Sequence, residues 1–200
     1  MIIGLTGGIA SGKSTVSALL KERRIPVVDA DVIAREVVEP GKSAYQQIVD
    51  AFGSSILLPT GEIDRKALGE IVFSDERQRQ VLNGIVHPQV RKEMTRQAKE
   101  ASQSGHELVV MDIPLLFESK LQYMVDKIVL VYVPSDLQLI RLMERDKIDE
   151  EQAQKRIKSQ FPIETKKNEA DFIIDNSGTR EETKVQVDQL LVTLRAELKQ

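Results

Sequence analysis

The stretch that decides the fold of this 200-residue chain reads Gly7-Gly8-Ile9-Ala10-Ser11-Gly12-Lys13-Ser14-Thr15. It fits the phosphate-loop pattern G-x-x-x-x-G-K-[ST] and lies between an apolar run and a helical pattern, as that motif requires. Glycines let the backbone approach phosphate oxygens. The N–H groups of such a loop, and the N-terminus of the helix after it, then meet the negative charge. A dinucleotide fingerprint is excluded, because it would need glycine where Ile9 stands.

The loop predicts an ATP site with Mg²⁺. Lys13 is expected to reach the β- and γ-phosphates, and the Ser14 hydroxyl is expected to hold the metal ion. The competing interpretation, a chance glycine-rich turn, is disfavoured by the strand and helix patterns on either side. The expected nucleotide-binding residues of the loop are Gly8, Ile9, Ala10, Ser11, Gly12, Lys13, Ser14 and Thr15.

Short β-branched runs alternate with longer helical patterns along the chain. Nearly continuous apolar runs are typical of strands covered on both faces, as in parallel sheets. We therefore expect an α/β fold: one P-loop NTPase-type domain over residues 1–200, with about five parallel strands and helices on both faces. The predicted strands are Ile2–Thr6, Pro26–Val28, Leu108–Met111, Lys127–Val133 and Phe172–Ile174.

One long stretch, about residues 32–105, contains no convincing strand. Its patterns predict helices over Asp64–Phe73 and Asp75–Val86, with Asp64 and Ser74 as plausible N-caps. This stretch is predicted to be a helical insertion that holds a substrate.

A second stretch, about residues 135–167, is predicted to be a helical lid. Ser135 and Gln138 form a capping-box pattern, and Asp149 opens a second helix. Its charge run either faces phosphates or is a solvated face, and its position within an ATP-binding sheet favours phosphates. The basic residues are Arg141, Arg145, Lys147, Lys155, Arg156 and Lys158.

The first two arginines of this run are candidates for catalysis. Arg141 and Arg145 are four residues apart and so share one helix face. Guanidinium groups suit bidentate phosphate contacts and can offset charge on a transferring phosphoryl group. After the lid, Thr179 and Glu182 form a capping box that predicts a helix over Thr179–Lys199, packed on the sheet.

Carboxylates follow two of the predicted strands. Ligands of open α/β sheets bind outside the carboxyl ends of the strands. Asp31 is the predicted base for an acceptor hydroxyl, and Asp29 is the predicted cap or supporting residue. Asp112 ends a strand like that of a Walker B motif, so it either supports Mg²⁺ indirectly or caps the strand end.

An apolar loop follows Asp112 directly. Pro114, Leu115 and Leu116 are candidates for contact with an organic acceptor, and plain core packing is the competing interpretation. The last strand is followed by Asp175-Asn176. Asn176 is a candidate for contact with the purine base, and a plain Asx turn in this loop is the alternative.

Histidine is scarce in this sequence. His87 is one of two and precedes Pro88, which biases it away from helical geometry. A lone histidine is more often structural, so we assign it no part in catalysis.

Composition narrows the function classes. The net charge of −3, the 4% aromatic content and the lack of tryptophan argue against nucleic-acid binding. No cysteine is present, which fits a reducing cytoplasm. We see no basic leader at the N-terminus and no apolar run near the roughly 20 residues that span a bilayer. We therefore expect a cytoplasmic protein with no nucleic-acid or membrane partner. The oligomeric state does not follow from these features, and a monomer or weak homo-oligomer is the working expectation.

An ordered set of motifs runs along nearly the whole chain. It comprises Ile3–Thr15, Val28–Asp31 with Ala34-Arg35, Val86–Pro88, Pro114–Glu118, Arg141–Asp146 and Ile174–Asn176. The phosphate loop by itself would indicate a superfamily, whereas the ordered set is more specific. This set resembles that of the dephospho-CoA kinase family.

The resemblance implies phosphorylation of the ribose 3′-hydroxyl of dephospho-CoA by ATP, the last step of coenzyme A synthesis. It implies Asp31 as the base, Lys13 as the phosphate lysine, and Arg141 and Arg145 as lid arginines. The expected substrate contacts are Asp31, Arg65 (with Lys66), His87, Pro114, Leu115 and Leu116.

Three alternatives compete with this interpretation. Another P-loop small-molecule or nucleoside monophosphate kinase would share the chemistry and differ in the acceptor. A GTP switch is disfavoured, because Asp146-Lys147-Ile148-Asp149 does not fit the guanine-reading N-K-x-D motif. A non-catalytic binding module is disfavoured by the intact Lys13, Ser14 and Asp31.

Overall fold

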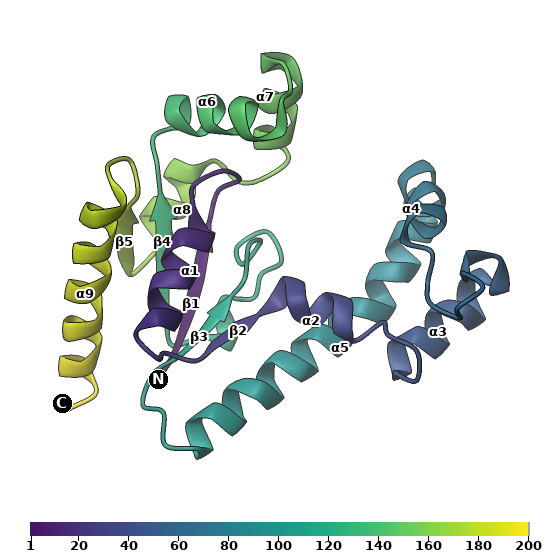
Figure 1. The fold of residues 1–200 in the computed structure, drawn as a ribbon, viewed down its shortest axis with the longest axis horizontal. Coiled ribbons are helices and arrows are strands. Elements are labelled where there is room, and N and C mark those ends of the chain that lie inside the picture. Colours follow the sequence, from purple (N-terminus) through teal and green to yellow (C-terminus); the bar gives the residue numbers. More distant parts are fainter. Residues whose placement is uncertain (200) are drawn as a thin grey trace. The chain divides into compact units, whose positions relative to one another are not determined.

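The computed structural model describes residues 1–199 (Figure 1). Its backbone divides into two compact units, residues 29–97 and the remainder, and each is described here by itself. The elements in chain order are β1 (Ile2–Gly7), α1 (Lys13–Glu22), β2 (Val27–Asp29), α2 (Ala30–Glu36), α3 (Ser43–Phe52), η1 (Ser54–Ile56), α4 (Arg65–Ser74), α5 (Glu76–Gln103), β3 (Val109–Asp112), η2 (Gln122–Met124), β4 (Lys127–Tyr132), α6 (Ser135–Asp146), α7 (Glu150–Lys158), α8 (Ile163–Glu169), β5 (Phe172–Asp175) and α9 (Arg180–Glu197).

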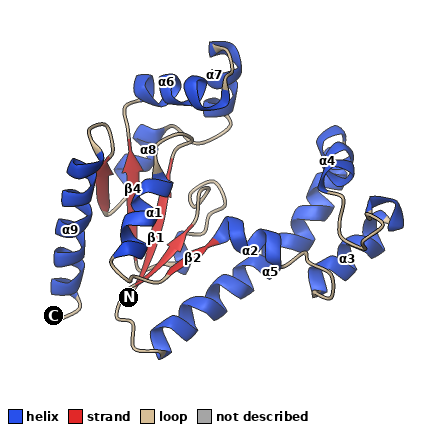
Figure 2. Cartoon of the chain, in the orientation of Figure 1, coloured by secondary structure: helices blue, strands red, loops and turns tan. Residues whose placement is uncertain are grey.

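The sheet has five strands in the order β2-β3-β1-β4-β5 (Figure 2). β1 pairs in parallel with β3 and with β4, and β4 pairs in parallel with β5. The predicted parallel α/β sheet is therefore confirmed, with every strand within one residue of its predicted bounds at either end. Because β1 is central, the loop after Gly7 emerges in the middle of the sheet's carboxyl edge.

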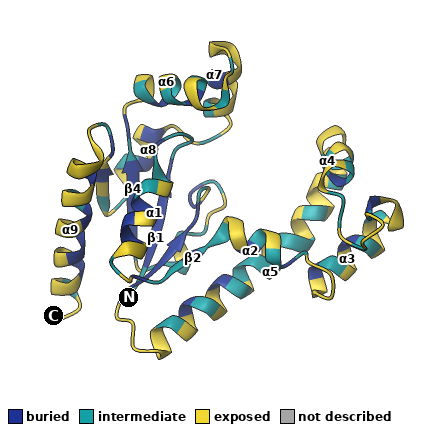
Figure 3. Ribbon diagram, in the orientation of Figure 1, coloured by how far each residue is buried: buried dark blue, intermediate teal, exposed yellow. Residues whose placement is uncertain are grey.

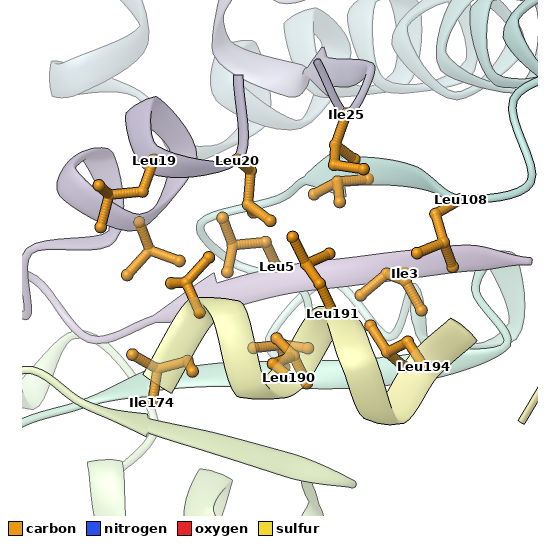
Figure 4. Close-up of a cluster of buried hydrophobic side chains, with 14 of the residues drawn as sticks. Ile3, Leu5, Leu19, Leu20, Ile25, Leu108, Ile174, Leu190, Leu191 and Leu194 are labelled. Atoms are coloured by element: carbon orange, nitrogen blue, oxygen red, sulfur yellow. The ribbon is translucent and has the colours of Figure 1, made fainter. Parts of the chain in front are cut away.

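Helices α1 and α9 pack together over one face of the sheet. Figure 4 shows Leu19 and Leu20 of α1 meeting Leu5 of β1 and Leu191 of α9 in one apolar cluster. Each such leucine removed from water contributes roughly 1.5–3 kcal/mol of transfer free energy. This packing holds α1, the helix that follows the phosphate loop, in place on the sheet.

The C-terminal helix begins as the sequence predicts. The Thr179 hydroxyl accepts from the Glu182 N–H, and the Glu182 carboxylate accepts from the Thr179 N–H at 2.7 Å, which completes the capping box. In Figure 3 one side of α9 is buried and the other exposed. Val185 falls on the exposed side, whereas Val187 is fully buried.

The unit of residues 29–97 has its own apolar cluster. Ile48, Ile56 and Leu68 form its centre, with partly buried residues of α5 packed around them. Asp64 caps α4, because its carboxylate accepts from the Lys66 and Ala67 N–H groups at 2.9 and 3.1 Å. That predicted cap is confirmed. The role of this unit in substrate binding stays a prediction.

Two local predictions in this unit are wrong. Ser74 is the last residue of α4, not a cap, and its hydroxyl donates back to the Glu70 and Ile71 carbonyls. Asp75 binds the first N–H groups of α5 in its place.

The second error concerns Pro88, which lies inside α5. A proline in a helix interior loses one backbone hydrogen bond and costs about 3 kcal/mol. Because α5 runs on for fifteen further residues and buries Met94 and Ala98, tertiary packing outweighs that local cost. None of the described helices is long and apolar enough to cross a bilayer.

Candidate active site

The phosphate loop connects β1 to α1, and hydrogen bonds between its own backbone groups fix its conformation. The Ser11 N–H donates to the Gly8 carbonyl at 3.1 Å, and the Thr15 N–H donates to the Gly12 carbonyl at 2.9 Å. Gly12 has a φ of 85°, a left-handed conformation that favours glycine. A Cβ at Gly12 would also collide with the Asn176 amide nitrogen. Glycine is therefore favoured here by the protein's own backbone and packing.

The N-terminus of α1 is prepared for an anion. Its first turn carries no acidic residue, and no side chain caps it. Ser14 is exposed there, so its hydroxyl is accessible to solvent. Free N–H groups and the helix dipole favour a negatively charged group at such an end.

Lys13 and Asp112 form an ion pair at this site. The Asp112 carboxylate is buried at the end of β3, and its Cα is paired in the sheet with that of Leu5. Sequence analysis left Asp112 open between metal support and a strand-end cap. The structure places its carboxylate on the ammonium of the phosphate lysine, where it restrains that side chain.

Asn176 holds the phosphate loop through a hydrogen bond to its backbone. Its Nδ2 donates to the Ser11 carbonyl at 2.9 Å, and its Oδ1 accepts from the Thr183 hydroxyl at 2.8 Å. The Asx turn given as an alternative for this loop is present at Asp175, whose carboxylate accepts from the Ser177 N–H at 2.9 Å. Contact between Asn176 and a purine base stays a prediction. Its structural role in holding the phosphate loop was not foreseen.

The predicted capping box at α6 is wrong. The cap residue is Pro134, and no side chain caps this helix. Gln138 is buried, and its Nε2 donates to the Ile9 carbonyl at 2.8 Å. The Gln138 side chain therefore binds the distant residue Ile9, and it does not cap the N-terminus of its own helix. Asp149 does cap α7, through the Gln152 N–H at 2.8 Å.

The arginines of the predicted lid have partners within the protein. Arg141 donates to the Asn176 carbonyl at 2.9 Å. Arg145 and Arg156 both bind the Asp146 carboxylate, at 2.7 and 2.6 Å. These bonds, the one from Arg145 foremost, hold the pKa of the Asp146 carboxyl below its ordinary value. Arg141, Arg145 and Arg156 therefore each have a polar partner within residues 1–199.

The two carboxylates after β2 have different surroundings. Asp29 Oδ1 accepts from the Asp31 and Val32 N–H groups at 3.0 and 3.1 Å and so caps α2. This agrees with the capping role predicted for Asp29. Asp31 is exposed, and within residues 1–199 its carboxylate has no hydrogen-bond or ion-pair partner. Asp31 thus keeps all of its acceptor capacity.

The residues predicted to contact the substrate differ in their exposure to solvent. Leu115 is exposed, but Leu116 is completely buried and packs against Gly4, so it cannot present an apolar surface to a ligand. Pro114 is partly buried, and its carbonyl accepts from the Thr6 hydroxyl at 3.1 Å. His87 is exposed on α5, where the predicted non-helical geometry is wrong.

Arg65 lies in a cavity lined by both basic and acidic side chains. At the start of α4 it lines a 440 Å³ space together with Arg35 and Lys66, within the unit of residues 29–97. Glu39, Glu62 and Asp64 line the same space, so its charge is mixed.

Two side chains that contact the loop, Gln160 and Lys166, were not predicted from the sequence. Gln160 accepts from the Ile9 N–H at 2.9 Å. Lys166 is buried, donates to the Gly7 carbonyl at 3.3 Å and pairs with Glu118 at 2.7 Å. The spacing in the sequence could have indicated the burial of Lys166. Lys166 lies three residues after the apolar Ile163, so in a helix the two side chains share one face.

A parallel sheet with β1 at its centre, a glycine-rich loop after β1, and a lysine paired with the carboxylate that ends β3 define a P-loop phosphotransferase. A family profile described as dephospho-CoA kinase matches residues 1–182. The chain belongs to the dephospho-CoA kinase family.

Individual relatives agree with this assignment. A dephospho-CoA kinase of Geobacillus kaustophilus is 56% identical over 191 residues, which cover 96% of this chain and 95% of the relative. One from Bacillus licheniformis is 53% identical over 193 residues and 96% of each chain. The solved dephospho-CoA kinase of Campylobacter jejuni superposes with a TM-score of 0.76 at 30% identity, over 96% of each chain.

Proposed function

We propose that this protein transfers the γ-phosphoryl group of ATP to the ribose 3′-hydroxyl of dephospho-CoA, giving coenzyme A and ADP. Membership of the dephospho-CoA kinase family supports the reaction. The single structural observation that carries it is the phosphate loop, with Lys13 held by Asp112. The other P-loop kinases considered from sequence lack comparable support.

Lys13 serves the phosphate side of the reaction. Phosphoryl transfer requires mainly positioning and charge stabilisation, since the transferring group spreads negative charge over its oxygens. The Lys13 ammonium and the N–H groups at the start of α1 supply positive charge to these oxygens. Asp112 keeps the ammonium directed and limits its rotamers.

Mg²⁺ fits the residues of this loop. The exposed Ser14 hydroxyl would hold it directly, and Asp112 would support it indirectly. Among residues 1–199 there is no cluster of three or more metal-binding side chains, which suits an ion held mainly by phosphate oxygens and water. When bound, the ion would neutralise charge between the β- and γ-phosphates.

Asp31 serves the acceptor side in this proposal. It follows β2 by two residues, and ligands of open α/β sheets bind outside the carboxyl ends of the strands. Its unpaired carboxylate would accept the proton of the 3′-hydroxyl as the new P–O bond forms and the bond to ADP breaks. Asp29 caps the helix that carries Asp31 and so orients it.

Two helical segments would complete the substrate sites. The cavity lined by Arg35, Arg65 and Lys66 offers cations for the phosphates of the acceptor, and the exposed Leu115 offers an apolar contact. Residues 135–167 would act as the lid, with Arg141 and Arg145 meeting the transferring phosphate. We propose that the enzyme works in the cytoplasm as a monomer or weak homo-oligomer, with no nucleic-acid or membrane partner.

The acceptor is tested by mass spectrometry of a reaction containing ATP, Mg²⁺ and dephospho-CoA. We expect one phosphate to be added to dephospho-CoA, with ADP formed in equal amount. Shikimate, gluconate and nucleoside monophosphates serve as competing acceptors. Much faster phosphorylation of any of these would overturn the acceptor assignment and leave the kinase class standing.

Amide hydrogen exchange tests the lid. Exchange across residues 135–167 is expected to slow when ATP and dephospho-CoA bind, because phosphate oxygens would give Arg141 and Arg145 new partners. Helix α9, which packs on the sheet, provides the internal reference. Identical exchange with and without ligands would show that these helices are an ordinary surface.

A further inference from the structure

The outer side of the phosphate loop is held by residues of the lid segment. Gln160, between α7 and α8, accepts from the Ile9 N–H at 2.9 Å, and Gln138 of α6 donates to the Ile9 carbonyl at 2.8 Å. A Cβ on Gly8 would collide with Gln138 and Ile163, so the loop lies directly against α6 and α8. The first half of the loop is thus packed on protein.

Lys166 is the charged member of this packing. Its side chain is completely buried, and its ammonium lies 2.7 Å from Glu118 Oε1 and 3.3 Å from the Gly7 carbonyl oxygen. Glu118 Oε1 also accepts from the Phe161 N–H at 3.0 Å. Within the described residues, Glu118 Oε2 is buried and has no hydrogen-bond partner.

This arrangement is poorly explained by stability. Burying two charges removes them from water, and a well-packed apolar pair of similar size is often equally stable or more stable. An unpartnered carboxylate oxygen adds a further cost. A role for the Lys166 ammonium beyond holding α8 in place is therefore indicated.

The contact between the Lys166 ammonium and the Gly7 carbonyl suggests what this role is. A trans peptide is planar, and its C=O and N–H groups point in opposite directions. When the Lys166 ammonium fixes the Gly7 carbonyl, it also fixes the Gly8 N–H on the opposite side of the same peptide. Two consecutive glycines do not fix the orientation of the peptide between them, because without side chains their backbone angles are weakly restricted.

We propose that Lys166 is a positioning residue for phosphoryl transfer: it sets the orientation of the Gly7–Gly8 peptide at the start of the phosphate loop, and Glu118 holds it there. Lys166 does not need to touch a ligand for this role. The inference deepens the proposed function and rests on its ATP-binding part. In this proposal, Lys166 of α8 and Gln160 together determine the conformation of the phosphate loop that binds ATP.

The test compares Lys166→Met, Lys166→Arg and the double variant Lys166→Met/Glu118→Gln. For each variant we would measure Tm, ATP affinity by calorimetry, and kcat and KM for both substrates. Lys166→Met is expected to lower Tm and to reduce kcat/KM for ATP on the order of 10²-fold, as small misplacements of a site can do. KM for dephospho-CoA is expected to change little.

The double variant separates positioning from charge balance. It contains no unpaired charge, so Tm is expected to return toward that of the wild type. ATP affinity and kcat are expected to stay low, since the Gly7 carbonyl still lacks its donor. Lys166→Arg keeps a cation with several donors and is expected to recover most of the activity.

Lys184→Met is the matched control. Lys184 is an exposed lysine of α9, outside the phosphate loop and the proposed lid. We expect its activity to match the wild type within about twofold, as for other surface changes.

Two results would overturn the proposal. One is wild-type ATP affinity and kcat in Lys166→Met. The other is a double variant that regains both Tm and activity, which would reduce Lys166 to a counter-ion of Glu118. If Lys166→Met does not fold, the double variant alone decides. Calorimetry with ATP needs no acceptor, so a wrong assignment of dephospho-CoA would leave this test valid.

Discussion

Replacing Lys13 with alanine is expected to lower kcat on the order of 10³-fold or more, the upper range for loss of one charge-stabilising donor. The ammonium is placed at the phosphate loop by its position at the start of α1 and by its bond to Asp112. Its loss removes charge compensation where negative charge spreads in the transition state. Steady-state kinetics with ATP and dephospho-CoA would measure the effect.

The ion pair adds a stability effect that must be separated from catalysis. Lys13→Ala takes the ammonium away from the buried Asp112 carboxylate, which costs about 1–3 kcal/mol. Lys13→Arg is the control, because it keeps a cation beside Asp112. We expect its Tm to stay close to that of the wild type and its kcat to remain low, since a planar guanidinium does not replace a compact ammonium. Near-normal turnover in folded Lys13→Ala would contradict the phosphate-loop mechanism.

Replacing Asp31 with asparagine is expected to lower kcat on the order of 10²-fold or more, the range typical of a positioned general base. Asparagine keeps the size and one acceptor oxygen but loses the basicity. The exposed carboxylate of Asp31 has no partner to lose within residues 1–199, so stability is expected to stay near that of the wild type. ATP affinity, measured by calorimetry, should also change little.

Asp29 provides the matched control. Its carboxylate caps α2, and asparagine caps helices about as well as aspartate, so Asp29→Asn is expected to be nearly silent. Asp29→Ala removes the cap and is expected to cost about 1 kcal/mol of stability. If Asp29→Asn lowers kcat more than Asp31→Asn does, with both variants folded, the roles of the two carboxylates are reversed.

Much of the fold could be predicted because its signals are local. The β-branched runs marked all five strands, and the glycine-rich motif placed the loop between β1 and α1. Caps made by neighbouring residues, such as Asp64, Asp149 and the Thr179–Glu182 box, were also predicted correctly. Each of these depends on residues within a few positions of one another.

Three of the errors have one cause: packing or a contact distant in sequence outweighs a local pattern. The Ser135–Gln138 capping pattern failed because Gln138 binds Ile9, 129 positions away. Leu116 was indistinguishable from Leu115 until the packing against Gly4 was known. Pro88 sits in a helix because packing along α5 outweighs its local cost.

The sequence by itself therefore determined the parallel sheet, the phosphate loop and its lysine, and the likeness to dephospho-CoA kinases. Only the tertiary structure decided what surrounds that loop: Asp112 on Lys13, Asn176 on Ser11, and Lys166 on Gly7. Short-range patterns reflect hydrogen bonds and side-chain spacing within one element, which neighbouring residues dictate. The loop's supports come from β3, from the residues after β5 and from α8, and these meet Gly7–Lys13 only when the whole sheet has formed.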